Sequence, residues 1–400
     1  MRFEGSIADR PDGAPLAAFL LLWLAGLSLR MTVLAVPPVI HLIRSGLGLS
    51  GTEVGLLVTL PTLLFAAVAL PGAVLVSRIG AVPTLVAGLF VTGAGAAARA
   101  VAPGFSTLLL ATAAMGAGIA VMQPTLPALV RRWLPERIGL GTAVYSNGLL
   151  VGEILPVSLT NRLVLPAVHG SWGASLAAWS VPILATALLV AFAAPAVDRA
   201  PGRPDSIVIA RARPRWDSPA TWLLGAMFGT INVTYFATNA FLPAYLTSRG
   251  AADLIPAALT ALNAGQLPAA FLMIAKAGRW QRRARPFYAT GLLCLAGIAG
   301  IVASSRLGVV ASAGVLGFGV SSAMVLALTL PALLFPPEHV AATSAAMFTI
   351  SYGGGIVASV AGGAAWDLAG DPIWAFTPVA LCSTALAVTA RALRRRGDLR

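Results

Sequence analysis

Charged side chains are scarce in this sequence. They make up 10% of its 400 residues, whereas hydrophobic residues make up 58%. A soluble globular protein carries roughly 25% charged residues, because its surface must face water. This composition excludes an ordinary soluble domain and predicts an exterior that faces lipid, where the backbone must satisfy its hydrogen bonds internally.

Groups that form catalytic or metal sites are also few. The two cysteines, Cys294 and Cys382, lie within hydrophobic runs and are interpreted as packing residues. The three histidines lie far apart, at segment ends or in loops. The sequence has no zinc-ligand spacing, no paired aspartates, no nucleophile elbow and no Walker motif of an ATP-driven pump. We therefore expect neither an enzyme nor a cofactor or metal site.

Long hydrophobic runs dominate instead. A helix needs about 20 apolar residues to span a bilayer, and by this rule the predicted fold is an all-α membrane protein with twelve transmembrane helices. The first run is too long for a cleaved signal peptide. The approximate ranges are 15–42, 53–77, 82–101, 106–130, 138–163, 173–195, 219–246, 253–276, 286–304, 308–334, 340–363 and 373–393.

The formal net charge of +13 would suggest nucleic acid in a soluble protein. Here the arginines lie in short gaps between hydrophobic runs, which is typical of anchors that face anionic lipid. With both termini in the cytoplasm, 21 of the 27 basic residues fall on the cytoplasmic side. Five fall on the other side: Arg44, Arg99, Arg162, Arg249 and Arg306. We expect a monomeric, multi-pass protein of the cell inner membrane with cytoplasmic termini and no nucleic-acid partner.

The longest polar gap, at about 196–218, is rich in proline and arginine. It predicts a cytoplasmic linker between an N-terminal six-helix half, residues 1–195, and a C-terminal half, residues 219–400. The pentapeptide TLPAL at 125–129 recurs at 329–333, and glycines 116 and 118 recur at 317 and 319. Such a duplication places a substrate site near the bilayer midplane, between the halves.

Arg30 is the most informative single residue. It lies about 15 residues into the first predicted helix, roughly 22 Å from its start, where a cation costs at least ~2.5–3.5 kcal/mol. Arg30 therefore needs an anionic ligand, an internal carboxylate or a water-filled cavity. Glu153 lies at a similar depth in the fifth helix. The two could form a static pair that ties helices together, or a switch in which protonation of Glu153 frees Arg30 to hold an anion.

Uncharged polar residues lie at comparable depth in several predicted helices. Each is either a helix–helix hydrogen-bonding group or a ligand contact; together with Arg30 they would form a polar pocket in an apolar wall. These candidates for substrate binding are Tyr145, Asn147, Asn232, Tyr235, Asn239, Asn263, Gln266 and Tyr352.

Short motifs along nearly the whole chain resemble the major facilitator superfamily, in particular its cyanate and nitroimidazole transporter branch. They are Leu29-Arg30 with Pro37, Pro38, Ile43-Arg44 and LGLS at 47–50; GAGIA at 116–120, LPALVRRWLP at 126–135 and Arg137; residues 139–145; Trp172 with Trp179; LPAYL at 242–246; and DLAG at 367–370. The resemblance implies a first-helix arginine that faces the central cavity, which falls on Arg30. It also implies small anions or aromatic nitro compounds as substrates, and alternating access of the two halves.

The chain departs from that pattern at several positions. The loop VSRIG at 76–80 lacks the usual acidic residue, Gln123 replaces an expected asparagine, Phe241 an expected tryptophan and Glu153 a small residue. Our leading hypothesis is a proton-coupled transporter, a symporter of a small, anionic organic solute, in which Arg30 binds the anion and Glu153 pairs with Arg30 or carries the proton. The alternatives are efflux of a hydrophobic or nitroaromatic compound and, more remotely, a non-transporting membrane sensor.

Overall fold

The computed structural model describes residues 13–198, 214–304 and 306–399. Within these ranges the regular structure is helical throughout. Most of the predicted linker, residues 199–213, lies outside the described residues, so the predicted boundary between the halves stays a prediction. The α-helices are α1 (Gly13–Ser28), α2 (Met31–Leu34), α3 (Ile40–Leu47), α4 (Gly51–Ile79), α5 (Ala81–Ala98), α6 (Phe105–Trp133), α7 (Ile138–Leu159), α8 (Leu165–Ala167), α9 (Trp172–Asp198), α10 (Pro219–Ser248), α11 (Ile255–Ala264), α12 (Gln266–Trp280), α13 (Ala284–Ala303), α14 (Arg306–Leu334), α15 (Pro337–Ala369) and α16 (Thr377–Arg395).

Short 3₁₀ or π segments extend several of these helices. They are η1 (Pro37–Val39), η2 (Arg99–Val101), η3 (Thr160–Val164), η4 (Ala252–Leu254) and η5 (Pro372–Phe376). Eleven segments of the described chain are long and apolar enough to cross a membrane. Helix α10 has 30 residues but is less apolar, because threonines, tyrosines and two asparagines interrupt it. With α10 included, the described chain has the twelve predicted membrane-spanning segments.

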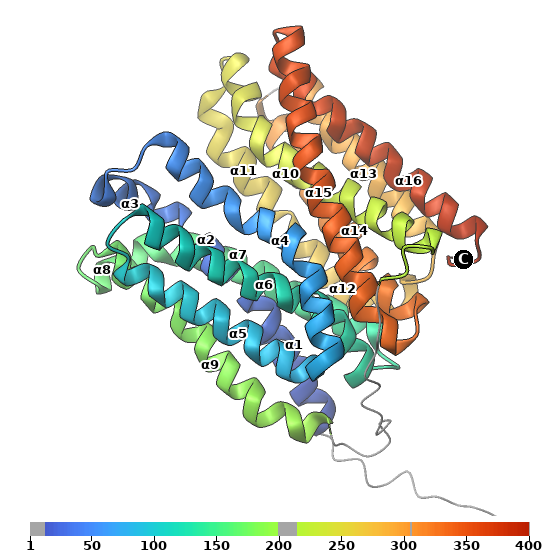
Figure 1. The fold of residues 1–400 in the computed structure, drawn as a ribbon. Coiled ribbons are helices and arrows are strands. Elements are labelled where there is room, and N and C mark those ends of the chain that lie inside the picture. Colours follow the sequence, from blue (N-terminus) through green and yellow to red (C-terminus); the bar gives the residue numbers. More distant parts are fainter. Residues whose placement is uncertain (1–12, 199–213, 305, 400) are drawn as a thin grey trace, which may run out of the picture.

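The two halves repeat the same set of helix contacts. In the first half α5 packs on α6 and α9, and α1 packs on α7 and α9. In the second half α13 packs on α14 and α16, and α10 packs on α15 and α16. These pairs are equivalent when each half is counted as six spans, so the structure confirms the fold class of two six-helix halves (Figure 1).

The halves approach each other most closely at one end of the bundle. We define the basic end as the end where α6, α12 and α16 finish, with Arg131, Arg132, Arg279, Arg394 and Arg395 in their last turns. There α12 packs on α7, and α4 packs on α15. In Figure 1, α4 and α15 lie close together toward the side where the C-terminus is marked. They diverge toward the end that carries α3 and α11. The molecule is therefore a wedge whose halves separate away from the basic end.

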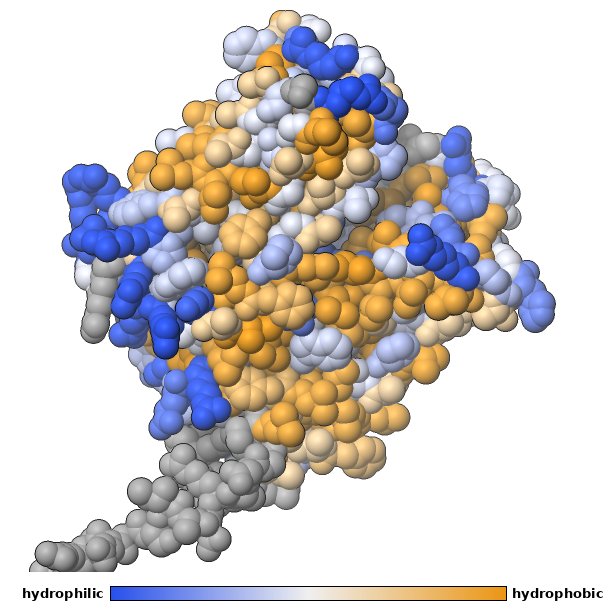
Figure 2. All heavy atoms as spheres, turned by 180° about the vertical axis from the view of Figure 1, so that it is seen from behind, coloured by the Kyte–Doolittle hydropathy of each residue, from blue (hydrophilic) through white to orange (hydrophobic). Residues whose placement is uncertain are grey.

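The exterior has the surface of a protein embedded in lipid. Large hydrophobic side chains are exposed along the membrane-spanning helices, for example Phe90, Leu110, Phe192, Leu292 and Val357. Figure 2 shows a broad hydrophobic band across one face, between hydrophilic groups at the two sides. Soluble proteins rarely expose large contiguous apolar patches, so the structure supports a multi-pass membrane protein.

Two spans that the sequence predicts as continuous helices are broken. The first span stops at Ser28 and resumes at Met31, and Pro37 and Pro38 start the short 3₁₀ turn η1 before α3. Proline lacks an N–H group, so the helical hydrogen-bond ladder is interrupted a second time at η1. The eighth span breaks at Gly265, between α11 and α12. Both breaks fall inside the predicted ranges 15–42 and 253–276, near functional candidates.

Glycines allow α1 and α7 to pack with backbone contact. A Cβ atom on Gly148 would lie 2.2 Å from the carbonyl oxygen of Trp23, and one on Gly152 would lie 2.2 Å from that of Leu27. Small residues permit this close approach in membrane helices, where van der Waals packing replaces the hydrophobic effect. The contact fixes α7, which carries Glu153, against the span that carries Arg30.

Replacing Gly148 by alanine is expected to lower the melting temperature of the purified protein, because the added methyl group must separate α1 from α7. Overpacking of this kind costs about 1–3 kcal/mol. The control is Gly353→Ala on α15, where an added Cβ meets no atom within 4 Å. It should leave the melting temperature unchanged or raise it, because alanine favours helix more than glycine does. Equal stability of the two variants would contradict the described α1–α7 packing.

Candidate functional site

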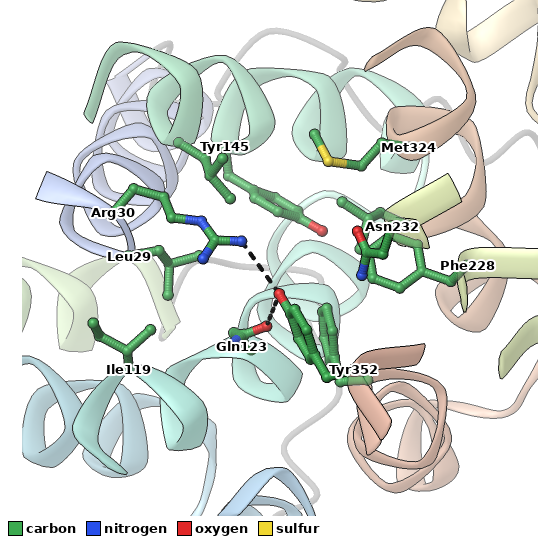
Figure 3. Close-up of a pocket in the computed structure, with 12 residues that line it drawn as sticks. Leu29, Arg30, Ile119, Gln123, Tyr145, Phe228, Asn232, Met324 and Tyr352 are labelled. Atoms are coloured by element: carbon green, nitrogen blue, oxygen red, sulfur yellow. Dashed lines mark hydrogen bonds between the residues drawn. The ribbon is translucent and has the colours of Figure 1, made fainter. Parts of the chain in front are cut away.

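A cavity lies between the halves, at the level where the first span is broken. It encloses about 430 Å³ of space between atoms, including the part open at its mouth. Its lining comes from the α1–α2 junction, α6 and α7 in one half and from α10, α14 and α15 in the other (Figure 3). The lining residues are Leu29, Arg30, Ile119, Gln123, Tyr145, Leu149, Phe228, Asn232, Met324, Leu328, Phe348 and Tyr352.

Arg30 reaches this cavity because it sits in the helix break. It is the residue before the first turn of α2 and has a non-helical backbone, with φ −123° and ψ −25°. Its Nε atom lies 3.4 Å from Oε1 of Glu153 on α7. The exposed fractions of the two side chains are 14% and 18%, so both ends of this ion pair are largely removed from solvent. The structure thus brings together the two charges whose pairing the sequence leaves open.

A chain of polar and aromatic contacts links Arg30 to the other half. Its NH2 group donates a hydrogen bond to the hydroxyl of Tyr352 at 3.2 Å, and that hydroxyl donates to Oε1 of Gln123 at 3.1 Å (Figure 3). The guanidinium carbon lies 5.3 Å from the centre of the Phe65 ring, a cation–π distance. Tyr352 comes from α15, so one hydroxyl group bridges the two halves beside the only charged side chain in the cavity lining.

The structure divides the uncharged candidates into two groups. Tyr145, Asn232 and Tyr352 line the cavity with Arg30. Asn232 also donates to Ser351 on α15 at 2.7 Å. The others lie outside the lining. Asn147 accepts a hydrogen bond from Nε1 of Trp23 at 3.0 Å, across the α1–α7 contact.

The remaining four candidates form one network at the break between α11 and α12. The Tyr235 hydroxyl donates to Oδ1 of Asn263 at 2.6 Å, and Nε2 of Gln266 donates to the same oxygen at 3.3 Å. Nδ2 of Asn263 donates to Oδ1 of Asn239 at 3.5 Å. This network, from Tyr235, Asn239, Asn263 and Gln266, ties α10 to the broken eighth span.

The cavity also contains residues that the sequence did not single out. Phe228, Met324 and Phe348 line it, and Phe65 packs on Tyr352 with ring centres 5.4 Å apart. Gln123 was noted only as a departure from a family pattern. Aromatic residues inside hydrophobic runs carry no signal that separates a cavity wall from a lipid-facing surface.

Arg99 differs in burial from the other basic residues predicted on the same side. Of the five basic residues predicted on the side opposite the cytoplasm, Arg44, Arg162, Arg249 and Arg306 are exposed, but Arg99 is 0% exposed. Its NH2 group donates to the backbone carbonyl of Thr32 at 2.9 Å, two residues beyond Arg30. Arg99 therefore belongs to the interior of the bundle, where it contacts the broken first span.

Two six-helix halves with a polar cavity between them are the architecture of a secondary transporter. The chain belongs to the Major Facilitator Superfamily, whose model matches residues 18–359. It is 29% identical to the cyanate transport protein CynX of Escherichia coli (strain K12), with 92% of this chain and 95% of the relative aligned. It is 30% identical to the 2-nitroimidazole transporter of the same organism, with 80% of each chain aligned. The resemblance inferred from short motifs is confirmed.

Solved structures support the fold. The chain superimposes on the MFS transporter FucP in the outward conformation with a TM-score of 0.71, at 15% identity, covering 95% of this chain and 99% of that one. A double-tryptophan variant of XylE gives a TM-score of 0.76 at 12% identity, with 96% of each chain covered. At such low identity the likeness concerns the fold alone.

Proposed function

We propose that the protein carries a small, anionic organic solute together with a proton across the cell inner membrane, by alternating access. The observation that carries this proposal is the largely buried Arg30–Glu153 pair at the cavity. Arg30 supplies the positive charge that an anion requires, and Glu153 supplies a group that can bind a proton beside it.

The charge balance of the site explains the coupling. A buried cation needs one compensating negative charge, because an unpaired ion in low dielectric is strongly unfavourable. With Glu153 ionised, that charge is internal and the site is neutral. When Glu153 takes up a proton, an external anion can replace it beside Arg30. The site then holds either the ion pair or a proton with an anion, so proton and solute move together.

The orientation follows from the positive-inside rule. The basic end faces the cytoplasm in this proposal, with the linker and both termini on that side. The halves pack at the basic end and separate at the other, which is the arrangement needed to receive a solute from outside. We also propose that the monomer is the transporting unit. Relatives named for cyanate and 2-nitroimidazole transport, and a neighbour named a fucose:proton symporter, agree with a small solute.

A direct test uses the full chain in proteoliposomes. Uptake of labelled small organic acids should depend on an imposed gradient with the acidic side outside, and a protonophore should abolish accumulation. Protein-free liposomes give the background, because weak acids also cross lipid in their neutral form. Uptake of an acid at a rate that ignores the pH gradient would contradict proton coupling. Failure of every acid tested would contradict the anion site.

A second candidate is efflux of a hydrophobic or nitroaromatic compound. It is favoured by the neutral Arg30–Glu153 pair and by the aromatic lining of the cavity. In that case a strain lacking the protein should become more sensitive to nitro-heterocycles, whereas loss of an uptake system should leave sensitivity unchanged or lower it.

Replacing Tyr352 by phenylalanine is expected to weaken solute binding by about tenfold, since the change removes the two hydrogen bonds that position Arg30 and Gln123, and a net loss of about 1.4 kcal/mol corresponds to a factor of ten. Arg30 loses its link to the other half, and Gln123 loses a donor. Half-saturation of uptake in proteoliposomes measures this. Tyr288→Phe on α13, outside the cavity lining, serves as the control. An unchanged half-saturation for Tyr352→Phe would remove this hydroxyl from the site.

A further inference from the structure

We infer that the preferred solute is a flat aromatic monocarboxylate, whose carboxylate is held by Arg30, Gln123 and Tyr145 and whose ring lies against Phe228 and Phe348. This inference rests on the proposed anion transport and names its substrate class. It comes from the separate distribution of hydrogen-bonding and aromatic groups in the cavity.

Three buried polar atoms that lack a hydrogen-bond partner among the described residues belong to this one cavity. They are Nε of Arg30, Nε2 of Gln123 and the hydroxyl oxygen of Tyr145. The Arg30 atom faces Glu153 at 3.4 Å but makes no hydrogen bond to it. The first two atoms can only donate, and the third can donate. Leaving such donors unpaired when buried is unfavourable.

The missing partner must therefore offer several acceptor lone pairs. A carboxylate has two oxygens with about four lone-pair sites and can accept from a guanidinium and from neutral donors at once. All three donors come from the N-terminal half: the α1–α2 junction, α6 and α7. Figure 3 shows the Arg30, Gln123 and Tyr145 side chains around the same space. The head group thus binds to one half.

The C-terminal half supplies the hydrophobic part of the cavity. Phe348 stacks on Tyr352 with ring centres 6.2 Å apart and an interplanar angle of 15°, and Phe228 meets Phe348 edge-on at 5.4 Å. Met324 and Leu328 complete this side. Aromatic faces and edges favour another flat ring over a saturated body of equal size. Asn232 is the one amide on this side, which allows a single polar substituent on the ring.

The charge of the cavity and its two-sided lining narrow the substrate class further. Arg30 is the one charged residue among the cavity lining, so a second carboxylate would be buried without a partner. An anion of a few atoms would touch only the donors of the N-terminal half, because the aromatic residues line the opposite side of the cavity. A ring with one carboxylate contacts both halves at once. That contact lets the solute favour the conformation in which the halves close around it.

Isothermal titration calorimetry on the purified full chain tests this class with four probes: benzoate, cyclohexanecarboxylate, acetate and benzamide. We expect benzoate to bind about tenfold more tightly than cyclohexanecarboxylate, because ring–ring contacts favour the flat probe, and acetate and benzamide to bind more weakly still. The Phe348→Leu variant should bind benzoate and cyclohexanecarboxylate equally. Phe192→Leu, at a position 82% exposed on the lipid-facing surface, is the matched control and should keep the preference.

The Gln123→Leu variant tests the contacts to the carboxylate separately from the contacts to the ring. It should weaken benzoate and cyclohexanecarboxylate by the same factor and keep their ratio, with the melting temperature of the ligand-free protein as the check on folding. If acetate or cyclohexanecarboxylate binds as tightly as benzoate, the aromatic class is wrong while anion transport stands. If benzamide binds and no carboxylate does, or if none of the four probes binds, both the class and the proposed anion site are wrong.

Discussion

Replacing Arg30 by alanine is expected to abolish concentrative uptake of the organic acid. The change removes the guanidinium that faces Glu153, Tyr352 and the cavity. Hydrogen bonds to a charged group contribute about 1.5–3 kcal/mol each, so uptake at low solute concentration should fall by at least about a hundredfold. Initial rates in proteoliposomes under an imposed pH gradient measure the loss.

This experiment needs a test of folding, because the change leaves Glu153 buried without its cation. Removal of one member of a buried ion pair typically costs ~3–5 kcal/mol. The double variant Arg30→Ala with Glu153→Gln removes both charges, so it should recover stability but not uptake. The surface variant Arg249→Ala is a matched control for loss of an arginine, since its pair with Asp371 is half exposed and contributes little. Normal uptake by the folded Arg30→Ala protein would exclude an anion site at this residue.

The membrane fold could be predicted from the sequence because its signals are additive along the chain. Hydrophobic runs of bilayer length and the basic gaps between them gave twelve spans, even for α10, whose Asn232 and Asn239 lower its hydropathy. The helix breaks at Arg30 and Gly265 were missed. A sum of hydrophobicity does not register the loss of backbone hydrogen bonds, and Pro37 and Pro38 signal only the later interruption at η1.

The position of Arg99 shows a second limit. The sequence places it near the end of the predicted helix 82–101, and that position alone does not indicate that the side chain turns inward to the Thr32 carbonyl. A residue near the end of a span can face lipid headgroups or the protein interior. That choice depends on the rotation of the helix against its neighbours, which no single-chain pattern encodes.

Only part of the candidate site could be predicted from the sequence. Arg30 and Glu153 stand out because a charge inside an apolar run has few structural explanations. Phe348 does not stand out, because a cavity-lining phenylalanine and the lipid-facing Phe192 look alike in sequence; one is 5% exposed and the other 82%. Asn147 and Tyr145 lie at similar depth along α7, so the sequence predicts the same role for both. Their side chains point in different directions: Asn147 contacts Trp23, and Tyr145 lines the cavity.

Replacing Glu153 by glutamine is expected to uncouple transport from the proton. Glutamine is neutral and close in shape to a protonated glutamate, so Arg30 stays available to an anion at every pH. Exchange of labelled for unlabelled solute across the liposome membrane should continue, whereas accumulation driven by a pH gradient should be lost. For one proton per monovalent anion, the wild-type protein can sustain about tenfold accumulation per pH unit, since 1.4 kcal/mol corresponds to a factor of ten.

The sign of this coupling can be checked in both directions. With the acidic side outside, Glu153 is protonated as it faces outward, the anion enters beside Arg30, and both are released inside, where the carboxylate loses its proton and restores the ion pair. With the gradient reversed, preloaded solute should leave faster through the wild-type protein and at an unchanged rate through Glu153→Gln. Asp217→Asn, an exposed acid outside the bundle core that pairs with Arg215, controls for loss of a carboxylate. If the gradient still drives accumulation in Glu153→Gln, the Arg30–Glu153 pair is a fixed tie between the broken first span and α7, and the coupling proton binds elsewhere.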